Sequence, residues 1–182
     1  MNETNQSIKE NLLNLQKMST ETGVVDLSDL GLIRFTGEDT VTFLQGQLSC
    51  DVRKVTSSQA QYGCYCSPKG RILANFFLAT DHTEEAWFMQ IPRAILDKII
   101  KRLSMYVLRA KVKLVDYSVE SIRLGIVGNQ AQSLIEKSLP TLSMPDSQLS
   151  VAQVAGITVI CLGPNRFEII APVEQGNQFK MY

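Results

Sequence analysis

Residues 59–80 read QAQYGCYCSPKGRILANFFLAT, and this stretch predicts two strands joined by a tight turn. Alternation along the first strand places four side chains on one face: Ala60, Tyr62, Cys64 and Cys66. The sequence SPKG suits the turn, because proline presets one backbone dihedral angle and glycine accepts a positive one. The second half, RILANFFLAT, is apolar almost throughout, which is typical of a strand buried on both faces.

On either side of this hairpin, short apolar runs bounded by glycine, proline or polar residues predict further strands. They are expected at residues 23–27, 31–35, 86–91, 111–117, 122–127, 151–155, 157–162 and 167–171. Apolar residues at helical spacing predict helices over 5–19, from Thr36 (with Asp39 in a capping-box arrangement), from Pro92, and over 131–139. Strands that come in groups with single helices between them indicate an α+β fold, not a regular βαβ alternation.

The composition is that of a globular protein, with 45% hydrophobic and 20% charged residues. Lys plus Arg and Asp plus Glu both number 18, so the formal net charge is zero. This balance disfavours direct nucleic-acid binding, because phosphate contacts need a surplus of Lys and Arg. The sequence shows no signal-peptide core and no apolar run near the length of about 20 residues that spans a bilayer. We therefore expect a cytoplasmic protein with reduced cysteines and no membrane partner.

The common catalytic and nucleotide-binding motifs, such as G-x-G-x-x-G, the P-loop, H-E-x-x-H and G-x-S-x-G, are absent from the sequence. The single histidine, His82, lies in the polar turn DHTEE, where a solvated side chain is expected. Cys64 and Cys66 share a strand face and in principle suit a shared metal, but no further ligands have a workable spacing. We interpret both as small apolar side chains of a core strand and expect no metal site.

Three stretches, in order, carry a family resemblance. Residues 43–52, FLQGQLSCDV, resemble the F-L-Q-G-Q-x-x-x-D-V helix and exit turn of the YgfZ-like proteins. Residues 61–75, QYGCYCSPKGRILAN, are similar to the strand–turn–strand of that family, and residues 163–169, GPNRFEI, are similar to its R-F or G-F-E strand. The chain thus resembles, from about residue 31 onward, the YgfZ-like folate-binding proteins. These belong to the wider family of GcvT, the aminomethyltransferase or T-protein of the glycine cleavage system.

The resemblance implies a fold of GcvT/YgfZ type, an α+β folate-binding domain made of two intertwined α+β subdomains. In the family a C-terminal β-barrel follows, and the motif K-G-C-Y-T-G-Q-E lies beyond the stretch matched here. Because the sequence contains no such motif, we expect an N-terminal part of a longer protein, with the barrel absent. The expected divisions are an N-terminal helical extension at 1–22, a first subdomain with a crossover at 23–140, a linker or loop at 141–150 and the start of a second subdomain at 151–182.

One position separates the YgfZ-like proteins from the aminomethyltransferases of the same family. In the aminomethyltransferases the second hairpin strand ends in two aspartates, and the second of these is essential near folate N5. The spacing from Tyr62 to the turn glycine Gly70 aligns that pair with Ala74 and Asn75. A carboxylate accepts a proton and stabilises a neighbouring cationic amine, whereas an amide does neither at neutral pH. The resemblance therefore implies that Asn75 binds folate, that no catalytic residue is present, and that classical aminomethyl transfer is lost.

Other binding residues follow from the same resemblance. Tyr62 matches a tyrosine that lines the folate site, although a core-facing strand aromatic has the same pattern. Phe77, two residues after Asn75 on the same strand face, is expected to wall the pocket or to pack in the core. Glu168 matches a glutamate that hydrogen-bonds the guanidine-like edge of the pterin, since a carboxylate suits a fork of N–H donors. A surface strand glutamate is the alternative.

The function that the resemblance implies is binding of tetrahydrofolate or a derivative by an accessory protein. Such a protein supports the maturation or repair of iron–sulfur enzymes, including those that modify tRNA, and those enzymes would be its partners. Two alternatives stay open. One is an aminomethyltransferase of the glycine cleavage system, against which Asn75 argues. The other is a non-catalytic interaction module with a vestigial folate pocket. Two departures from the family favour it: Leu30 stands where some YgfZ-like proteins have a folate-contacting tryptophan, and Cys161 replaces a family tyrosine.

Overall fold

The computed structural model describes residues 22–81 and 85–175, whose strands form two five-stranded antiparallel sheets. Sheet A has the order β1-β7-β10-β9-β8 and consists of β1 (Gly23–Asp26), β7 (Ser121–Val127), β8 (Val151–Val154), β9 (Ile157–Gly163) and β10 (Arg166–Pro172). Sheet B has the order β3-β4-β5-β2-β6 and consists of β2 (Leu30–Thr36), β3 (Gln61–Cys66), β4 (Ile72–Asp81), β5 (Ala86–Pro92) and β6 (Lys113–Asp116). The expected α+β class is confirmed.

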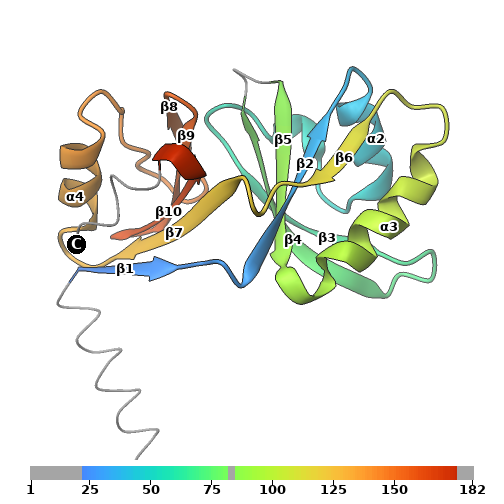
Figure 1. The fold of residues 1–182 in the computed structure, drawn as a ribbon, viewed down its shortest axis with the longest axis horizontal. Coiled ribbons are helices and arrows are strands. Elements are labelled where there is room, and N and C mark those ends of the chain that lie inside the picture. Colours follow the sequence, from blue (N-terminus) through green and yellow to red (C-terminus); the bar gives the residue numbers. More distant parts are fainter. Residues whose placement is uncertain (1–21, 82–84, 176–182) are drawn as a thin grey trace, which may run out of the picture.

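The chain passes between the two sheets twice, so that the subdomains are intertwined as expected (Figure 1). It begins in sheet A with β1, crosses to sheet B for β2 to β6, and returns to sheet A with β7. The expected boundary at residue 140 does not coincide with this division. β7 pairs with β10 from Ser121↔Pro172 to Val127↔Arg166, so strands on both sides of that boundary belong to one sheet. Residues 141–149 contain no helix or strand and connect two elements of the same subdomain.

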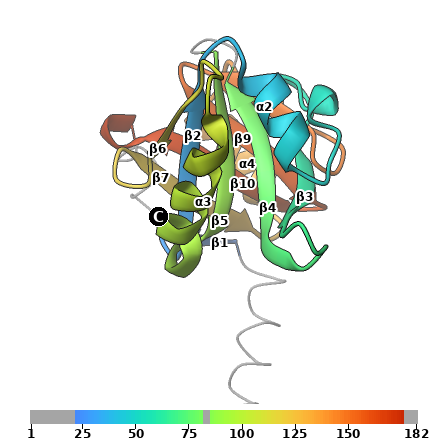
Figure 2. The same cartoon turned by 90° about the vertical axis from the view of Figure 1, so that its right-hand side faces the viewer.

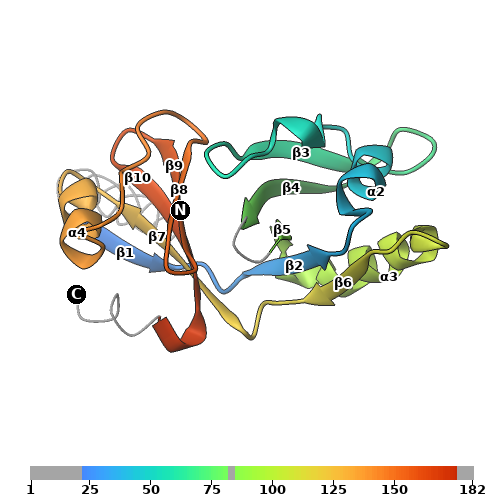
Figure 3. The same cartoon turned by 90° about the horizontal axis from the view of Figure 1, so that it is seen from above.

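The helices lie on the outer faces of the two sheets. α4 (Ala131–Ser138) covers sheet A, whereas α2 (Thr40–Gln47) and α3 (Leu96–Val107) cover sheet B, with short 3-10 turns at Val52–Lys54 and Arg93–Ile95. Figure 3 shows the resulting order of layers, from α4 through the two sheets to α2 and α3, and Figure 2 shows α2 and α3 in front of the strands of sheet B. The inner faces of the sheets therefore meet each other.

Three hydrophobic clusters follow from this layering. One lies between sheet B and its helices, and another lies between sheet A and α4. The third joins the inner faces of the two sheets, with Leu32, Phe77 and Phe88 from sheet B against Ile160 and Ile170 from sheet A. Burial of apolar side chains on both sides of each sheet is the main favourable term that holds the layers together.

The first helix begins later than the capping-box arrangement predicts. Thr36 is the last residue of β2, where it pairs with Lys113, and α2 starts at Thr40. Asp39 precedes the helix but makes no side-chain cap; its carboxylate accepts a hydrogen bond from the Lys111 backbone at 2.8 Å instead. The expectation of a helix from Thr36 was wrong. Asp39 hydrogen-bonds with Lys111, which lies far along the chain, instead of capping the first turn of a helix, and the local sequence does not show such a contact.

Two other local expectations need correction. Pro92 ends β5 instead of starting a helix, because it pairs with Leu30, and the next residue, Arg93, donates its backbone N–H to Asp29 O at 2.9 Å. β4 is buried on both faces only from Phe76 onward, and Ile72 at its start is 61% exposed. The helix expected at residues 5–19 lies outside the described residues.

Candidate functional site

A row of side chains crosses the inner face of sheet B. Tyr62 on β3 stands opposite Phe77 on β4, Phe77 opposite Gln90 on β5, and Gln90 opposite Leu32 on β2. The rings of Tyr62 and Phe77 meet edge to face, with centroids 5.5 Å apart. Because antiparallel partners project to the same side, this register places two aromatic rings and one amide toward sheet A.

Sheet A presents one acidic side chain to this row. Glu168 lies in β10, between Gly125 of β7 and Ile160 of β9, and is 4% exposed. Its Oε1 atom is buried and has no hydrogen-bond partner among the described residues, and the same is true of Oε1 of Gln90. Buried acceptors without partners are rare in proteins, because each loses its hydration without compensation. Two of them at one place identify a candidate site for N–H donors.

These side chains border one cavity of about 570 Å³ at the junction of the sheets. Its polar lining residues include Tyr62, Gln90, Arg166 and Glu168. The remaining lining residues are apolar side chains or glycine: Val25, Leu27, Leu30, Phe77, Gly125, Ile126, Val127, Leu162 and Phe167. A mostly apolar cavity of a few hundred Å³ with a few polar groups has the form of a small-molecule site.

Burial controls the charge of Glu168. Loss of hydration raises the pKa of its carboxyl group from the usual 4.5 to about 7. A hydrogen bond with the Gln90 side chain and the charges of Arg123 and Arg166 oppose this rise. The carboxyl group is therefore poised between its neutral and charged forms near neutral pH, and a ligand that donates hydrogen bonds to the carboxylate would favour the charged form.

Arg123 supplies one of these opposing charges from inside sheet A. It is buried on β7, and its guanidinium donates hydrogen bonds to Ser121 Oγ at 2.9 Å and to the Ser118 carbonyl at 3.3 Å. Burial lowers the pKa of this guanidinium, and the charge of Glu168 partly offsets the effect. Arg123 does not line the cavity, so its effect on the site is electrostatic.

The structure brings together Tyr62, Phe77 and Glu168 of the expected binding residues, but not Asn75. Asn75 is exposed on the same face of β4, opposite Cys64, whose thiol donates to its Oδ1 at 3.2 Å. The Cys64–Asn75 pair lies two residue pairs along the ladder from the Tyr62–Phe77 pair, and Asn75 does not line the cavity. Asn75 is thus exposed and lies outside the lining of the cavity.

The two departures from the family pattern fall in different places. Leu30 lines the cavity, so the departure expected at this position concerns the pocket itself. Cys161 faces the opposite side of sheet A, in the cluster under α4. It therefore cannot weaken the aromatic character of this cavity, contrary to the sequence-based expectation.

Sequence reasoning missed Gln90 and Arg123. Each is a polar residue in an otherwise apolar strand, AWFMQIP for β5 and SIRLGIV for β7. A single amide or guanidinium side chain within an apolar strand sequence is the pattern that indicates such residues, because a polar group inside a core needs a specific partner.

Two negative findings concern metals and membranes. Within residues 22–81 and 85–175, no three His, Cys, Asp or Glu side chains come close enough together to hold a metal ion, and His82 lies outside those ranges. Across the same ranges, every helix falls short of the length or apolar character that crossing a bilayer demands.

Comparison with known proteins identifies the fold. The structure matches the glycine cleavage system aminomethyltransferase T from Bartonella henselae with a TM-score of 0.79 at 17% identity, over 92% of this chain and 46% of that one. It also matches a heterotetrameric sarcosine oxidase from Corynebacterium with a TM-score of 0.58 at 10% identity, over 91% of this chain and 85% of that one. The fold is that of an aminomethyltransferase-type α+β protein.

The sequence comparisons give the family. The model of the GCVT N-terminal domain matches residues 4–179, and the chain belongs to that family. The tRNA-modifying protein YgfZ of Colwellia psychrerythraea is 32% identical over 78% of this chain and 42% of its own length. The protein of the same name from Vibrio vulnificus is 30% identical over 97% of this chain and 52% of its own length. The chain spans about half the length of these curated relatives.

Proposed function

We propose that the cavity between the two sheets binds tetrahydrofolate or one of its derivatives. The observation that carries the proposal is a pair of buried acceptors at the cavity wall, Oε1 of Glu168 and Oε1 of Gln90, which have no partner in the part of the chain that the structure describes. The guanidine-like edge of a pterin presents a fork of N–H donors that complements such acceptors. Tyr62 and Phe77 supply aromatic surface for the rest of the ligand.

Tetrahydrofolate carries one-carbon groups, and this chain's part would be to hold it and orient it. Glu168 and Gln90 would fix the pterin edge, and Leu30 and Phe77 would exclude water from it. Asn75 supplies no carboxylate, so the proposed activity stops at binding and does not include classical aminomethyl transfer.

The proposed role of the bound folate is to support the maturation or repair of iron–sulfur enzymes, including those that modify tRNA. The similarity to proteins named tRNA-modifying protein YgfZ supports this role. Cells lacking the gene would be complemented with the native gene or with Glu168→Ala. Mass spectrometry would then compare the tRNA nucleosides that depend on iron–sulfur enzymes. Restoration by the native gene alone is expected, and equal restoration by both would contradict a folate-dependent role.

Calorimetric titration of the chain with 5-formyltetrahydrofolate tests the binding step. Glu168→Ala should weaken binding by roughly ten- to a hundredfold, because hydrogen bonds to a charged group contribute about 1.5–3 kcal/mol. Glu174→Ala, which removes an exposed carboxylate, is the matched control and should bind like the native chain. Absence of binding to the native chain would favour the vestigial pocket that Leu30 suggests.

A further inference from the structure

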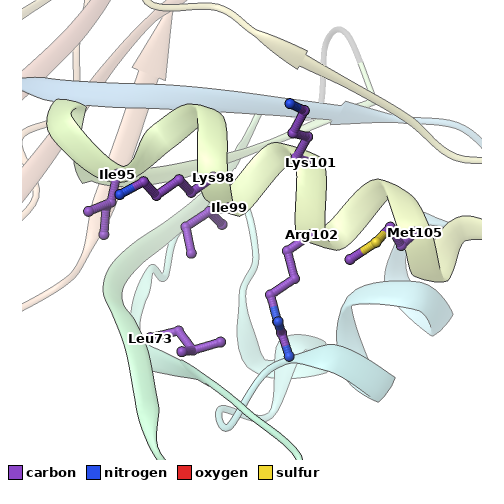
Figure 4. A pocket seen from close by; sticks show the side chains of 7 residues that line it. All are labelled: Leu73, Ile95, Lys98, Ile99, Lys101, Arg102 and Met105. Atoms are coloured by element: carbon purple, nitrogen blue, oxygen red, sulfur yellow. The ribbon is translucent and has the colours of Figure 1, made fainter.

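The outer side of sheet B carries a second hollow, separate from the cavity between the two sheets. A groove of about 610 Å³ runs along α3 beside the start of β4. Figure 4 shows Ile99 and Arg102 extending from α3 toward the side on which Leu73 of β4 lies. We call it the α3 groove; its apolar lining residues are Leu73, Ile95, Ile99 and Met105.

Apolar side chains are exposed in this groove. Of the apolar residues that line it, Met105 is 63% and Leu73 is 36% exposed. Single exposed apolar residues are common, but a group of them around a concave surface marks an interaction site. Methionine is also enriched where proteins bind other proteins.

The charged lining of the α3 groove has one sign. Among the described residues, Lys98, Lys101 and Arg102 contribute to it and no carboxylate does. Arg102 also has a buried Nε atom without a hydrogen-bond partner among the described residues, although its guanidinium is hydrogen-bonded with Tyr65. Cations without facing carboxylates around an apolar floor complement a ligand that is both acidic and apolar.

We propose that the α3 groove is a docking site for an acidic amphipathic segment of a partner protein. A helix would lay its apolar face on Leu73, Ile99 and Met105 and place Asp or Glu side chains beside the three cations. A nucleic acid fits less well, because its backbone needs a longer series of basic contacts and has no apolar face to cover this floor.

This proposal is independent of folate binding. α3 packs on the outer face of sheet B, with Leu96, Ile99 and Leu103 buried against it. The cavity proposed to bind folate lies on the inner face. The two sites share no lining residue, so variants of one leave the other intact.

The test is fluorescence anisotropy with the full chain and a labelled synthetic peptide. The peptide is a helix of about 15 residues, with Leu at helical spacing on one face and Glu on the other. Binding is expected, and Met105→Asp and the double variant Lys98→Glu/Lys101→Glu should each weaken it at least about tenfold. The matched controls are Val119→Asp and Lys137→Glu, which change exposed residues outside the groove and should leave affinity unchanged.

Three outcomes would overturn the proposal. The first is no binding of the acidic peptide, or equal binding of a matched peptide with Lys in place of Glu. The second is tighter binding of a single-stranded oligonucleotide that is lost with Lys98→Glu/Lys101→Glu but kept with Met105→Asp, which would assign the groove to nucleic acid. The third is concentration-dependent dimerisation abolished by Met105→Asp, which would assign it to a second copy of the chain.

Discussion

The carboxyl group of Glu168 on β10 is hydrogen-bonded with the side chain of Gln90 on β5, although the two residues belong to different sheets. This contact lies where the two sheets meet, and both side chains line the cavity. Within residues 22–81 and 85–175, each side chain retains a buried oxygen without a hydrogen-bond partner. The contact therefore joins the sheets and leaves acceptors available to a ligand.

Glu168 should make the unliganded protein less stable as the pH rises. Its folded-state pKa of about 7 exceeds the usual 4.5, so between these values the folded chain holds a proton that the unfolded chain has lost. The free energy of unfolding therefore falls through this window, and above pH 7 the folded state carries a buried charge. Glu168→Gln should remove this dependence, which amounts to roughly 3 kcal/mol between pH 4 and 8.

Urea denaturation followed by the fluorescence of the single tryptophan, Trp87, measures this difference at each pH. Glu174→Gln is the matched control, because the same substitution is made at an exposed carboxylate. If native and Glu168→Gln chains lose stability in parallel between pH 4 and 8, the carboxyl group is not buried as the structure shows.

The Tyr62 ring should contribute to ligand affinity without contributing much to stability, because it is 56% exposed at the cavity. Tyr62→Ala should weaken binding of 5-formyltetrahydrofolate by roughly three- to tenfold, whereas Tyr62→Phe keeps the edge-to-face contact with Phe77 and should cost less. Calorimetry measures both affinities. A larger loss with Tyr62→Phe than with any other pocket variant would instead assign the main role to the hydroxyl group.

Asn75→Asp should fold normally and should not gain ligand affinity. Asn75 is exposed, its Oδ1 already accepts the Cys64 thiol hydrogen bond, and a carboxylate oxygen can accept the same bond. The change in the free energy of unfolding should stay within about 0.5 kcal/mol, as for most surface substitutions. Thermal denaturation and the folate titration measure the two effects. A strong change in affinity would mean that the ligand reaches beyond the lined cavity to Asn75.

The strands were largely predictable from sequence, whereas the site was predictable only in part. Alternation and apolar runs located β3, β4 and the β8–β10 meander, because these signals are local. The period of two also placed Tyr62, Asn75 and Phe77 on one face. It could not show that the cavity ends before Asn75, because β1, β7 and β10 of the other sheet close the cavity.

Long-range contacts explain the other differences. Gln90 becomes part of the site only because the fold brings Glu168 of β10 beside it. The sequence near either residue gives no indication of that contact. Likewise, Asp39 accepts a hydrogen bond from Lys111, 72 positions away, instead of capping a helix that starts at Thr36. Tertiary contacts of this kind override local propensity.

The turn after β2 offers a test of one such contact. Gly37 has φ of +119°, and a Cβ there would lie 2.1 Å from the Lys111 carbonyl oxygen, a backbone atom that has little room to move. Gly37→Ala should lower the free energy of unfolding by roughly 2 kcal/mol or more. Gly70→Ala is the control, because its φ is +75° but its Cβ would meet nothing within 4 Å, and it should cost about 1 kcal/mol. Equal losses in urea denaturation would mean that the contact with Lys111 is not close.

Leu30→Trp should strengthen folate binding. Leu30 lines the cavity at the position where, by the sequence resemblance, some YgfZ-like proteins have a folate-contacting tryptophan, and it is only half-buried, so a larger side chain has room there. An added aromatic contact contributes about 0.5–1.5 kcal/mol, which corresponds to an affinity gain of roughly three- to tenfold in calorimetry. Val119→Trp, at an exposed position outside the cavity, is the control for the added indole and should leave affinity unchanged. If neither the native chain nor Leu30→Trp binds 5-formyltetrahydrofolate, the pocket does not serve folate. If only Leu30→Trp binds it, the native pocket has lost folate through this single position.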